Sequence, residues 1–195
     1  YVLHCLRKVF QQLLNKMKIS FVSRGTLLIA LLSLVGMITL KVFPTSSQFF
    51  ILDGNSHFTS WKWYLSNFTY IFGHIDSLHL IGNLSIILLL GPLIELKFGM
   101  KQMLLMTLVT ALLTAILHTL LWDNGLLGAS GIAFMYIVLT SLLNSRGKEI
   151  PFTFILIVLL YLGQEIYSSF QKDNISHFAH LFGGAMGAFW GLFRK

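Results

Sequence analysis

The sequence has little charge and few of the residues that stabilise small soluble folds or hold metals. Only 11% of its 195 residues are charged, whereas an ordinary soluble domain is about a quarter charged. Its single cysteine, Cys5, excludes an internal disulfide framework and a thiolate-rich metal site. The remainder is 55% hydrophobic, with a mean hydropathy of +0.76. This composition predicts a membrane protein rather than a cytosolic one.

The net charge of +7 is not evidence for nucleic-acid binding. The basic residues are confined to particular segments, and no nucleic-acid-binding motif accompanies them. Their placement is better explained by topology, so no nucleic-acid partner is expected.

Six apolar stretches are long enough to cross a hydrocarbon layer about 30 Å thick, which takes roughly 17 to 25 residues of helix. They cover residues 26–43, 78–94, 103–121, 128–144, 152–168 and 178–192. The sequence therefore predicts an all-α, polytopic bundle of six transmembrane helices over residues 26–195. The long connection over 44–73 is rich in aromatic residues, which favour the membrane interface.

Basic residues gather on one side of these spans, the side expected to be cytoplasmic. If the N-terminus is inside, that side carries eleven of the fourteen Lys and Arg, and only Lys41, Lys62 and Lys172 fall outside. Both termini are therefore predicted to be cytoplasmic, with the 44–73 connection on the outer side. Residues 1–25 mix apolar and basic residues at helical spacing, which predicts an amphipathic segment on the inner surface of the lipid bilayer.

Polar side chains in spanning regions are costly, and the first group of them leads into the second span. The segment GHIDSLHLIGN contains His74, His79 and Asn83. Four residues advance a helix by about 400°, so His79 and Asn83 should share one face, a turn apart. If the helix already includes His74, the His74 side chain points to a different face from His79 and Asn83.

Two further groups open the fourth and sixth spans. GLLGASGIAF contains Gly128, Ser130 and Gly131, and SHFAHLFGGAMG contains His180 followed by Gly183, Gly184 and Gly187. Glycines three, four and seven residues after a histidine lie on its face of the helix, and such faces permit close packing of membrane helices. We expect the two helices to pack there and to bring the Ser130 hydroxyl within hydrogen-bond reach of the His180 ring.

A serine beside a histidine can perform acyl transfer, because the imidazole takes the hydroxyl proton and then protonates the leaving amine. The backbone N–H groups at the helix start, near Ser130, and the His79 and Asn83 side chains could stabilise an oxyanion. No acidic residue is placed to orient His180, so the pattern indicates a Ser/His dyad. Activity should need no metal or cofactor and should rise with pH as His180 becomes neutral.

These motifs, taken in order, resemble those of the rhomboid family of intramembrane serine proteases. They are His74-x4-His79-x3-Asn83, Gly91-x3-Glu95-x3-Gly99, Gly128-Ala129-Ser130-Gly131 and Ala179-His180-x2-Gly183-x3-Gly187. The match runs from about residue 69 to 187. Each motif alone is weak, but their conjunction is specific.

The resemblance implies a hydrolase with a six-span core of the prokaryotic type, in an inner or plasma membrane, that cuts single-span or polytopic membrane proteins in or near their helices. Ser130 would be the nucleophile, His180 the general base, and the Ser130 N–H, His79 and Asn83 the oxyanion hole. His74, Gly128, Gly131, Phe134, Gly183, Gly187 and Glu95 would support this site. The outer half of the fifth span, around 161–167, would correspond to a lateral gate.

Two positions depart from the family pattern. Phe134 stands where the family often has tyrosine; its ring can still pack on the His180 imidazole but supplies no hydroxyl. Leu65 and Ser66 occupy the place of a Trp-Arg pair that many members carry. Glu95, near the inner end of its span, is expected to be an interfacial anchor or a structural hydrogen-bond partner.

Other classes fit less well. A metal-dependent intramembrane protease would be expected to carry H-E-x-x-H, which is absent. An aspartyl protease needs two membrane-embedded aspartates, but Asp53, Asp76, Asp123 and Asp173 all fall in the predicted outer connections. A transporter would more often show broken helices or charges at the midplane. The strongest alternative is a catalytically silent rhomboid-like protein that binds membrane clients without cutting them.

Overall fold

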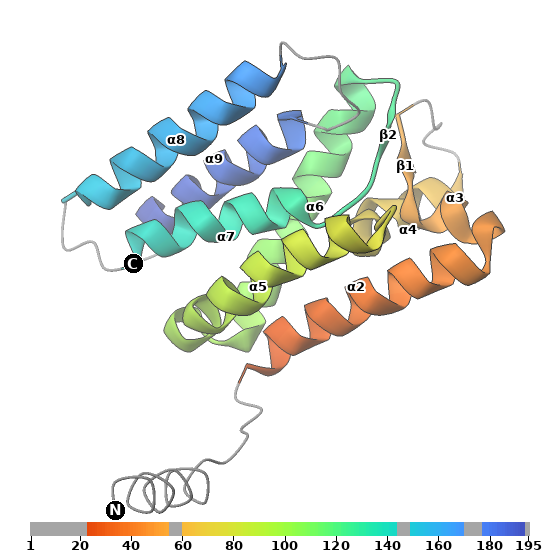
Figure 1. The fold of residues 1–195 in the computed structure, drawn as a ribbon, viewed down its shortest axis with the longest axis horizontal. Coiled ribbons are helices and arrows are strands. Elements are labelled where there is room, and N and C mark those ends of the chain that lie inside the picture. Colours follow the sequence, from red (N-terminus) through yellow and green to blue (C-terminus); the bar gives the residue numbers. More distant parts are fainter. Residues whose placement is uncertain (1–22, 55–59, 144–148, 170–176, 194–195) are drawn as a thin grey trace, which may run out of the picture.

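The computed structural model describes residues 23–54, 60–143, 149–169 and 177–193, and almost all of them lie in helices (Figure 1). The six principal helices are α2 (Arg24–Val42), α5 (Ser77–Phe98), α6 (Met100–Leu121), α7 (Ser130–Leu142), α8 (Phe152–Ser169) and α9 (His177–Phe193). Between α2 and α5 lie two short helices, α3 (Ser47–Phe50) and α4 (Trp61–Thr69), and two 3-10 turns, Pro44–Ser46 and Tyr70–Phe72. Most of the predicted amphipathic segment at the N-terminus falls outside the described residues.

Each of the six predicted stretches holds a helix, which confirms the all-α polytopic class. Among the described residues, α2, α5 and α6 are long and apolar enough to cross a membrane, while α7 and the first part of α8 are shorter apolar helices. α7 begins at Ser130, two residues later than predicted, because Gly128 has a φ of +115°, which does not continue a helix. The first turns of α5, α7 and α9 lie at the same end of the bundle (Figure 1).

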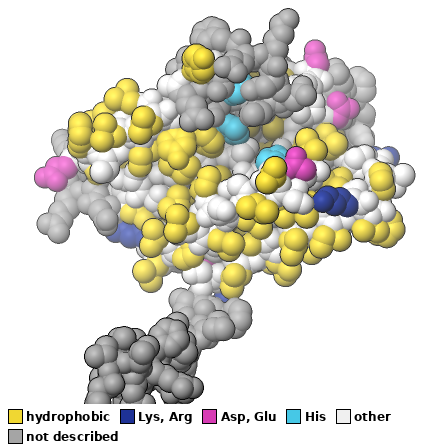
Figure 2. Space-filling view, in the orientation of Figure 1, with side chains coloured by type: hydrophobic (Ala, Val, Ile, Leu, Met, Phe, Trp, Pro, Cys, Tyr) yellow, Lys and Arg dark blue, Asp and Glu magenta, His cyan; other side chains and the backbone are white. Residues whose placement is uncertain are grey.

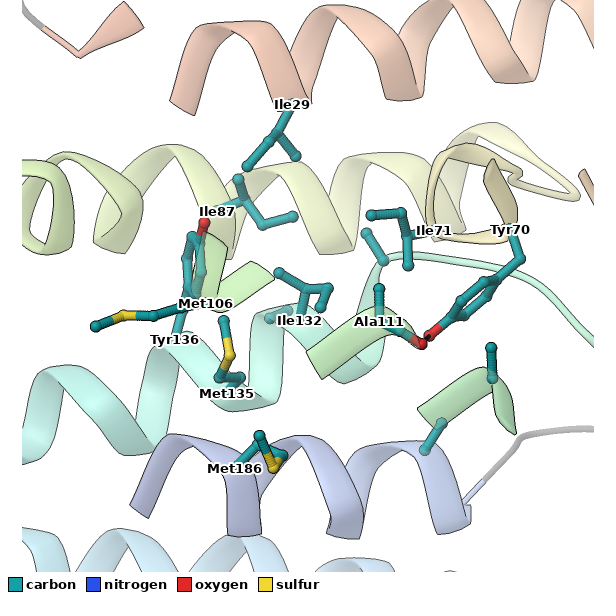
Figure 3. Packing of buried hydrophobic residues seen from close by; sticks show 14 of the residues in the cluster. Ile29, Tyr70, Ile71, Ile87, Met106, Ala111, Ile132, Met135, Tyr136 and Met186 are labelled. Carbon is teal, nitrogen blue, oxygen red and sulfur yellow. Dashed lines mark hydrogen bonds between the residues drawn. The ribbon is translucent and has the colours of Figure 1, made fainter. Parts of the chain in front are cut away.

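α7 is the central helix of the bundle. It contacts α5, α6, α8 and α9, and α2 packs on the far side of α5. Its side chains Met135, Tyr136 and Leu139 are fully buried. They meet Met106 of α6 and Met186 of α9 in the core (Figure 3). A central, enclosed α7 leaves the other helices to face the surroundings.

The outer faces of these helices are strongly apolar. Hydrophobic side chains cover much of the face in Figure 2, and few charged groups interrupt them. Leu89 of α5 and Leu160 of α8 are each about 70% exposed. Exposed apolar surface on this scale requires an apolar surrounding, as a bilayer provides.

The C-terminal end of α5 is joined to the start of α2 through Glu95. The Glu95 carboxylate accepts the backbone N–H groups of Gly25 and Thr26, and the Thr26 hydroxyl, each at 3.0 Å. The first N–H groups of a helix have no partner within it, so Glu95 caps α2 from another helix. Of the two roles considered for Glu95, the structure favours the hydrogen-bond partner, because the side chain is only 8% exposed.

The 44–73 connection is folded onto the bundle rather than being a simple loop. Strand β1 (Leu52–Asp53) pairs antiparallel with β2 (Gly125–Leu126), just before α7. The Trp63 indole donates to the Thr119 hydroxyl at 3.2 Å, and the Tyr70 hydroxyl donates to the carbonyl of Ala111 at 3.1 Å (Figure 3). These contacts fix the approach of the chain to α7 and were not expected from the sequence.

Candidate active site

The closest helix contact in the site is between α7 and α9, along the predicted glycine strip. A Cβ added to Gly183 would lie 2.0 Å from the Gly131 carbonyl oxygen, and one added to Gly187 would lie 2.4 Å from the Met135 carbonyl oxygen. On the other helix, a Cβ at Gly131 would lie 2.9 Å from the Ala179 carbonyl oxygen. Only glycine permits such backbone contact at these positions, so the expected close packing of the two helices is confirmed.

This contact brings the residues next to Ser130 and His180 together. Gly131 directly follows Ser130, and Ala179 directly precedes His180. Ser130 is the first residue of α7, and the capping residue is Ala129. Because Ala129 is the cap, Ser130 does not have the common capping role of a serine at a helix start.

The His180 side chain is held between helices. It is 9% exposed, and the Phe134 ring stacks on it with a centroid distance of 4.5 Å and an interplanar angle of 7°. The Tyr161 ring of α8 meets the Phe134 ring edge-on, with a centroid distance of 5.4 Å. The ring of Phe134 therefore fixes the plane of the imidazole, and α8 supports Phe134.

The first turn of α5 lies directly against the approach to α7. Gly128 donates its backbone N–H to the Tyr70 carbonyl at 2.9 Å, and a Cβ on it would lie 2.8 Å from His79 Nε2 and 3.8 Å from Asn83 Nδ2. With its positive φ as well, Gly128 has no room for a side chain. The side chains of His79 and Asn83 therefore lie beside Gly128, which precedes Ser130 by two residues.

His74 lies in the same cluster, because the helix does not include it. α5 begins only at Ser77, so His74 precedes the helix and folds back over it. Its Nε2 lies 3.0 Å from Asn83 Nδ2, its Nδ1 lies 3.3 Å from the Phe72 carbonyl oxygen, and its ring is 4.9 Å from that of His79.

The protonation state of His74 follows from its burial, which lowers its pKa to about 4. A neutral imidazole has one N–H, and the Phe72 carbonyl can only accept, so Nδ1 carries the proton. Nε2 then accepts from the Asn83 amide. This bond orients the amide of Asn83 and leaves its second N–H for another acceptor.

Two features of the site were missed by sequence reasoning. Asp76 caps α5, since its carboxylate accepts the backbone N–H of His79 at 2.8 Å, and it therefore sets where the helix begins. The pattern D-S-L-H before an apolar run was a usable signal for this cap. Trp122 stacks on Phe178 at 4.2 Å, and no periodicity in the sequence indicates that contact.

Metal ligation has no support in the geometry of this region. In the part of the chain that the structure describes, no three His, Cys, Asp or Glu side chains lie together as possible ligands. The candidate site instead combines one hydroxyl, three imidazoles and one amide from α5, α7, α9 and the turn before α5.

Comparisons with known proteins agree with this arrangement. Residues 60–195 match the family model described as the Rhomboid domain. The chain is also similar to the rhomboid protease GlpG of Haemophilus influenzae, with 25% identity over 122 residues, 61% of this chain and 64% of that protein. The matched region thus spans less than two thirds of the length of that relative. The domain match covers well over half of the sequence, and with the apolar helices it makes this chain an integral membrane protein of the rhomboid family.

Proposed function

We propose that this protein is an intramembrane serine endopeptidase in which Ser130 is the nucleophile and His180 the general base. The observation that carries the proposal is the glycine-mediated contact of α7 with α9, which packs Gly131 against Ala179, the residues next to Ser130 and His180. Stacking on Phe134 gives the imidazole a fixed plane. A serine is a weak nucleophile unless a base is positioned in this way.

In the proposed reaction the Ser130 Oγ attacks the carbonyl carbon of the scissile peptide bond while His180 takes the hydroxyl proton. The C–N bond then breaks, and His180 returns that proton to the leaving amine. Water attacks the resulting ester, with its proton passing to His180. Release of the carboxylic acid restores the Ser130 hydroxyl, so no metal or cofactor is required.

The negative oxygen of the tetrahedral intermediate would be held by the Ser130 backbone N–H, His79 and Asn83. Ser130 is at the first position of α7, where backbone N–H groups have no partner within the helix. Asn83 keeps one amide N–H after its bond to His74. Removing such a donor typically costs about 10²- to 10³-fold in kcat, which is the effect expected of Asn83→Ala.

The length of α7 supports a reaction centre below the membrane surface. Its 13 residues span about 20 Å, whereas the 22 residues of α5 span about 33 Å, close to the thickness of the hydrocarbon layer. A central helix this short does not cross the whole hydrocarbon layer, and we propose that its first residue is the recessed end. Ser130 would then meet substrates at the depth of a transmembrane helix.

The substrates we propose are single-span or polytopic membrane proteins, cut in or near a spanning helix. This proposal rests on the proposed recessed position of Ser130 and on the similarity to a protein named a rhomboid protease. We place both termini on the cytoplasmic side, because eleven of the fourteen Lys and Arg lie there in that orientation. The site would then open near the outer face of a prokaryotic inner or plasma membrane.

The test is cleavage of a generic single-span substrate by the purified protein in liposomes. Wild type is compared with Ser130→Ala and His180→Ala, and Ser141→Ala serves as the matched control. Ser141 lies on the same helix, and its hydroxyl donates to the Val138 carbonyl at 2.6 Å. We expect cleavage to be lost in the first two variants and retained in the control.

Two outcomes would contradict the proposal. Equal cleavage in all four proteins would remove Ser130 and His180 from the mechanism. An intact wild type that binds the substrate without cutting it would favour the catalytically silent, client-binding alternative. Inhibition of the wild type by a metal chelator would also count against a Ser/His dyad.

A further inference from the structure

A pocket of about 190 Å³ lies between α8 and the α7–α9 pair, to one side of the reaction centre. Phe134 and Val138 of α7, Phe154 and Val158 of α8, and Leu181 and Ala188 of α9 contribute to its walls. His180 borders it at the outer end, and nearly all of its lining is apolar. Ala188 lies eight residues beyond His180, so the pocket extends inward by about 12 Å along α9.

The small residues that line this pocket on α9 are not required for packing on α7. Gly183 and Gly187 each approach the backbone of α7 so closely that a Cβ has no room. Gly184 differs, since a Cβ there would meet only the Val138 side chain, at an ordinary 3.6 Å. Ala185, which follows it, is exposed. The face of α9 toward α8 therefore carries small residues that are not in tight contact. Space remains between the two helices as a result.

The chemistry of the pocket limits what can occupy it. A buried water needs two to four polar partners, and an apolar cavity of about 150 Å³ stays dry and takes hydrocarbon instead. A spanning helix, which is about 10 Å wide, is far too large for it. An occupant must be slender and apolar, and a segment of hydrocarbon chain meets both conditions.

The bilayer brings such a chain to the pocket directly. α8 carries exposed Leu156, Leu159 and Leu160 on its outer surface, and the pocket lies beneath the same helix at the depth of the spanning segments. Ala185 is exposed at its wall, so the pocket communicates with the surroundings of the bundle. We propose that one acyl chain of a membrane lipid inserts between α8 and α9 and occupies this pocket.

The inserted chain would touch the groups that hold the histidine. Phe134 lines the pocket and stacks on His180, and Tyr161 lines it and meets Phe134 edge-on. The lipid chain would thereby pack against the Phe134 ring on which the His180 imidazole stacks. The pocket borders the proposed reaction centre at His180, and its occupation by a lipid chain needs neither cleavage nor a protein substrate.

Photolabelling tests the proposal on the full chain. The protein is reconstituted without substrate in phosphatidylcholine vesicles in which a fraction of the lipid carries a diazirine on one acyl chain, and adducts are mapped after irradiation. Leu139, which is fully buried, reports background, and Leu160, which faces outward, reports ordinary lipid contact. We expect labelling of Leu181 and Ala188 to be close to that of Leu160 and severalfold above that of Leu139.

Matched variants separate the pocket from the outer surface. Ala188→Leu and Val158→Phe fill the pocket and should abolish labelling of Leu181, while Leu160→Phe, on the outer face, should leave it unchanged. Val158→Ala enlarges the pocket without crowding and should raise the labelling. Labelling of Leu181 no higher than that of Leu139 in the wild type, or unchanged by filling, would overturn the proposal. Because turnover is not measured, this result is independent of the cleavage assay.

Discussion

The Phe134 ring lies flat on the His180 imidazole, with centroids 4.5 Å apart and planes 7° from parallel. The two residues come from α7 and α9, the helices joined by the glycine strip. The stack can be this regular because the backbone contact at Gly131 and Gly183 fixes the spacing of the helices. A histidine held in one plane presents its ring nitrogens in fixed directions, and the stack would in this way orient His180 as the proposed general base.

Phe134→Ala should therefore lower kcat about two- to tenfold, because a ring pair contributes about 0.5–1.5 kcal/mol and 1.36 kcal/mol corresponds to tenfold in rate. Phe134→Tyr keeps the ring and should retain near wild-type activity. Initial rates of substrate cleavage in liposomes provide the comparison. The stack has no catalytic importance if the alanine variant cleaves as fast as the wild type.

Gly183→Ala should destabilise the bundle by about 1–3 kcal/mol, because its Cβ would lie 2.0 Å from the Gly131 carbonyl oxygen and would force α7 and α9 apart. Gly163→Ala on α8 is the matched control, since a Cβ at Gly163 meets nothing within 4 Å. Thermal unfolding in detergent measures both. A Gly183→Ala variant as stable as the control would mean that the helix contact is looser than described.

Local patterns in the sequence were sufficient to predict the helices and the glycine contact. Each of the six apolar stretches holds a helix, because a helix satisfies the backbone polar groups of an apolar segment within that segment. Gly183 and Gly187 were read correctly because their spacing from His180 is a property of one helix. The Phe134 ring was expected on His180, and it is found there.

Contacts between distant segments could not be predicted in this way. Glu95 binds Gly25 and Thr26, about 70 residues away, and no periodicity connects them. The sequence left open whether the helix of the second span includes His74, and so where its side chain points. The Asp76 cap starts α5 at Ser77, which frees His74 to turn back toward Asn83. The residue at which one helix begins therefore decides where the His74 side chain lies.

The stability of the protein should fall in mild acid, in part through His74. Burial lowers the pKa of His74 to about 4, whereas the unfolded chain has a value near 6.5. Between these values the unfolded state binds more protons, so the contribution of His74 is complete above about pH 6.5 and is lost as the pH falls toward 4.

Replacing His74 by glutamine should weaken this dependence, because glutamine offers Asn83 a neutral acceptor that does not titrate. The difference in Tm between pH 7.5 and pH 5 is compared for the wild type and His74→Gln, and it should be smaller in the variant. An equal difference in both proteins would show that other groups account for the acid sensitivity.

Glu95→Ala should lower the free energy of unfolding by about 1–3 kcal/mol, because it leaves two backbone N–H groups and one hydroxyl at the start of α2 without their acceptor. Glu95→Gln retains one carbonyl oxygen and should lose less. Unfolding midpoints of the two variants in the same detergent provide the measurement. If neither Glu95→Ala nor Glu95→Gln lowered the unfolding midpoint, the cap would contribute nothing to the attachment of α2.

Trp122 is expected to position His180 from a distance. Its indole is stacked between the His118 imidazole, at 6.0 Å, and the Phe178 ring, at 4.2 Å. The His118 ring is itself tied to the Asn124 carbonyl at 2.8 Å. Phe178 lies on the first turn of α9, two residues before His180, so the stack joins the end of α6 to the part of α9 that carries the proposed general base.

Trp122→Ala should release that first turn and lower kcat about two- to tenfold with little change in KM, because the stack aligns the base without touching the substrate. Trp122→Phe keeps a ring against Phe178 and should restore most of the rate. Trp61→Ala is the matched control, since Trp61 is 63% exposed and lies on α4. If Trp122→Ala cleaved as fast as Trp61→Ala, or if phenylalanine failed to restore the rate, the Trp122 indole would serve packing at the end of α6 and would not align His180.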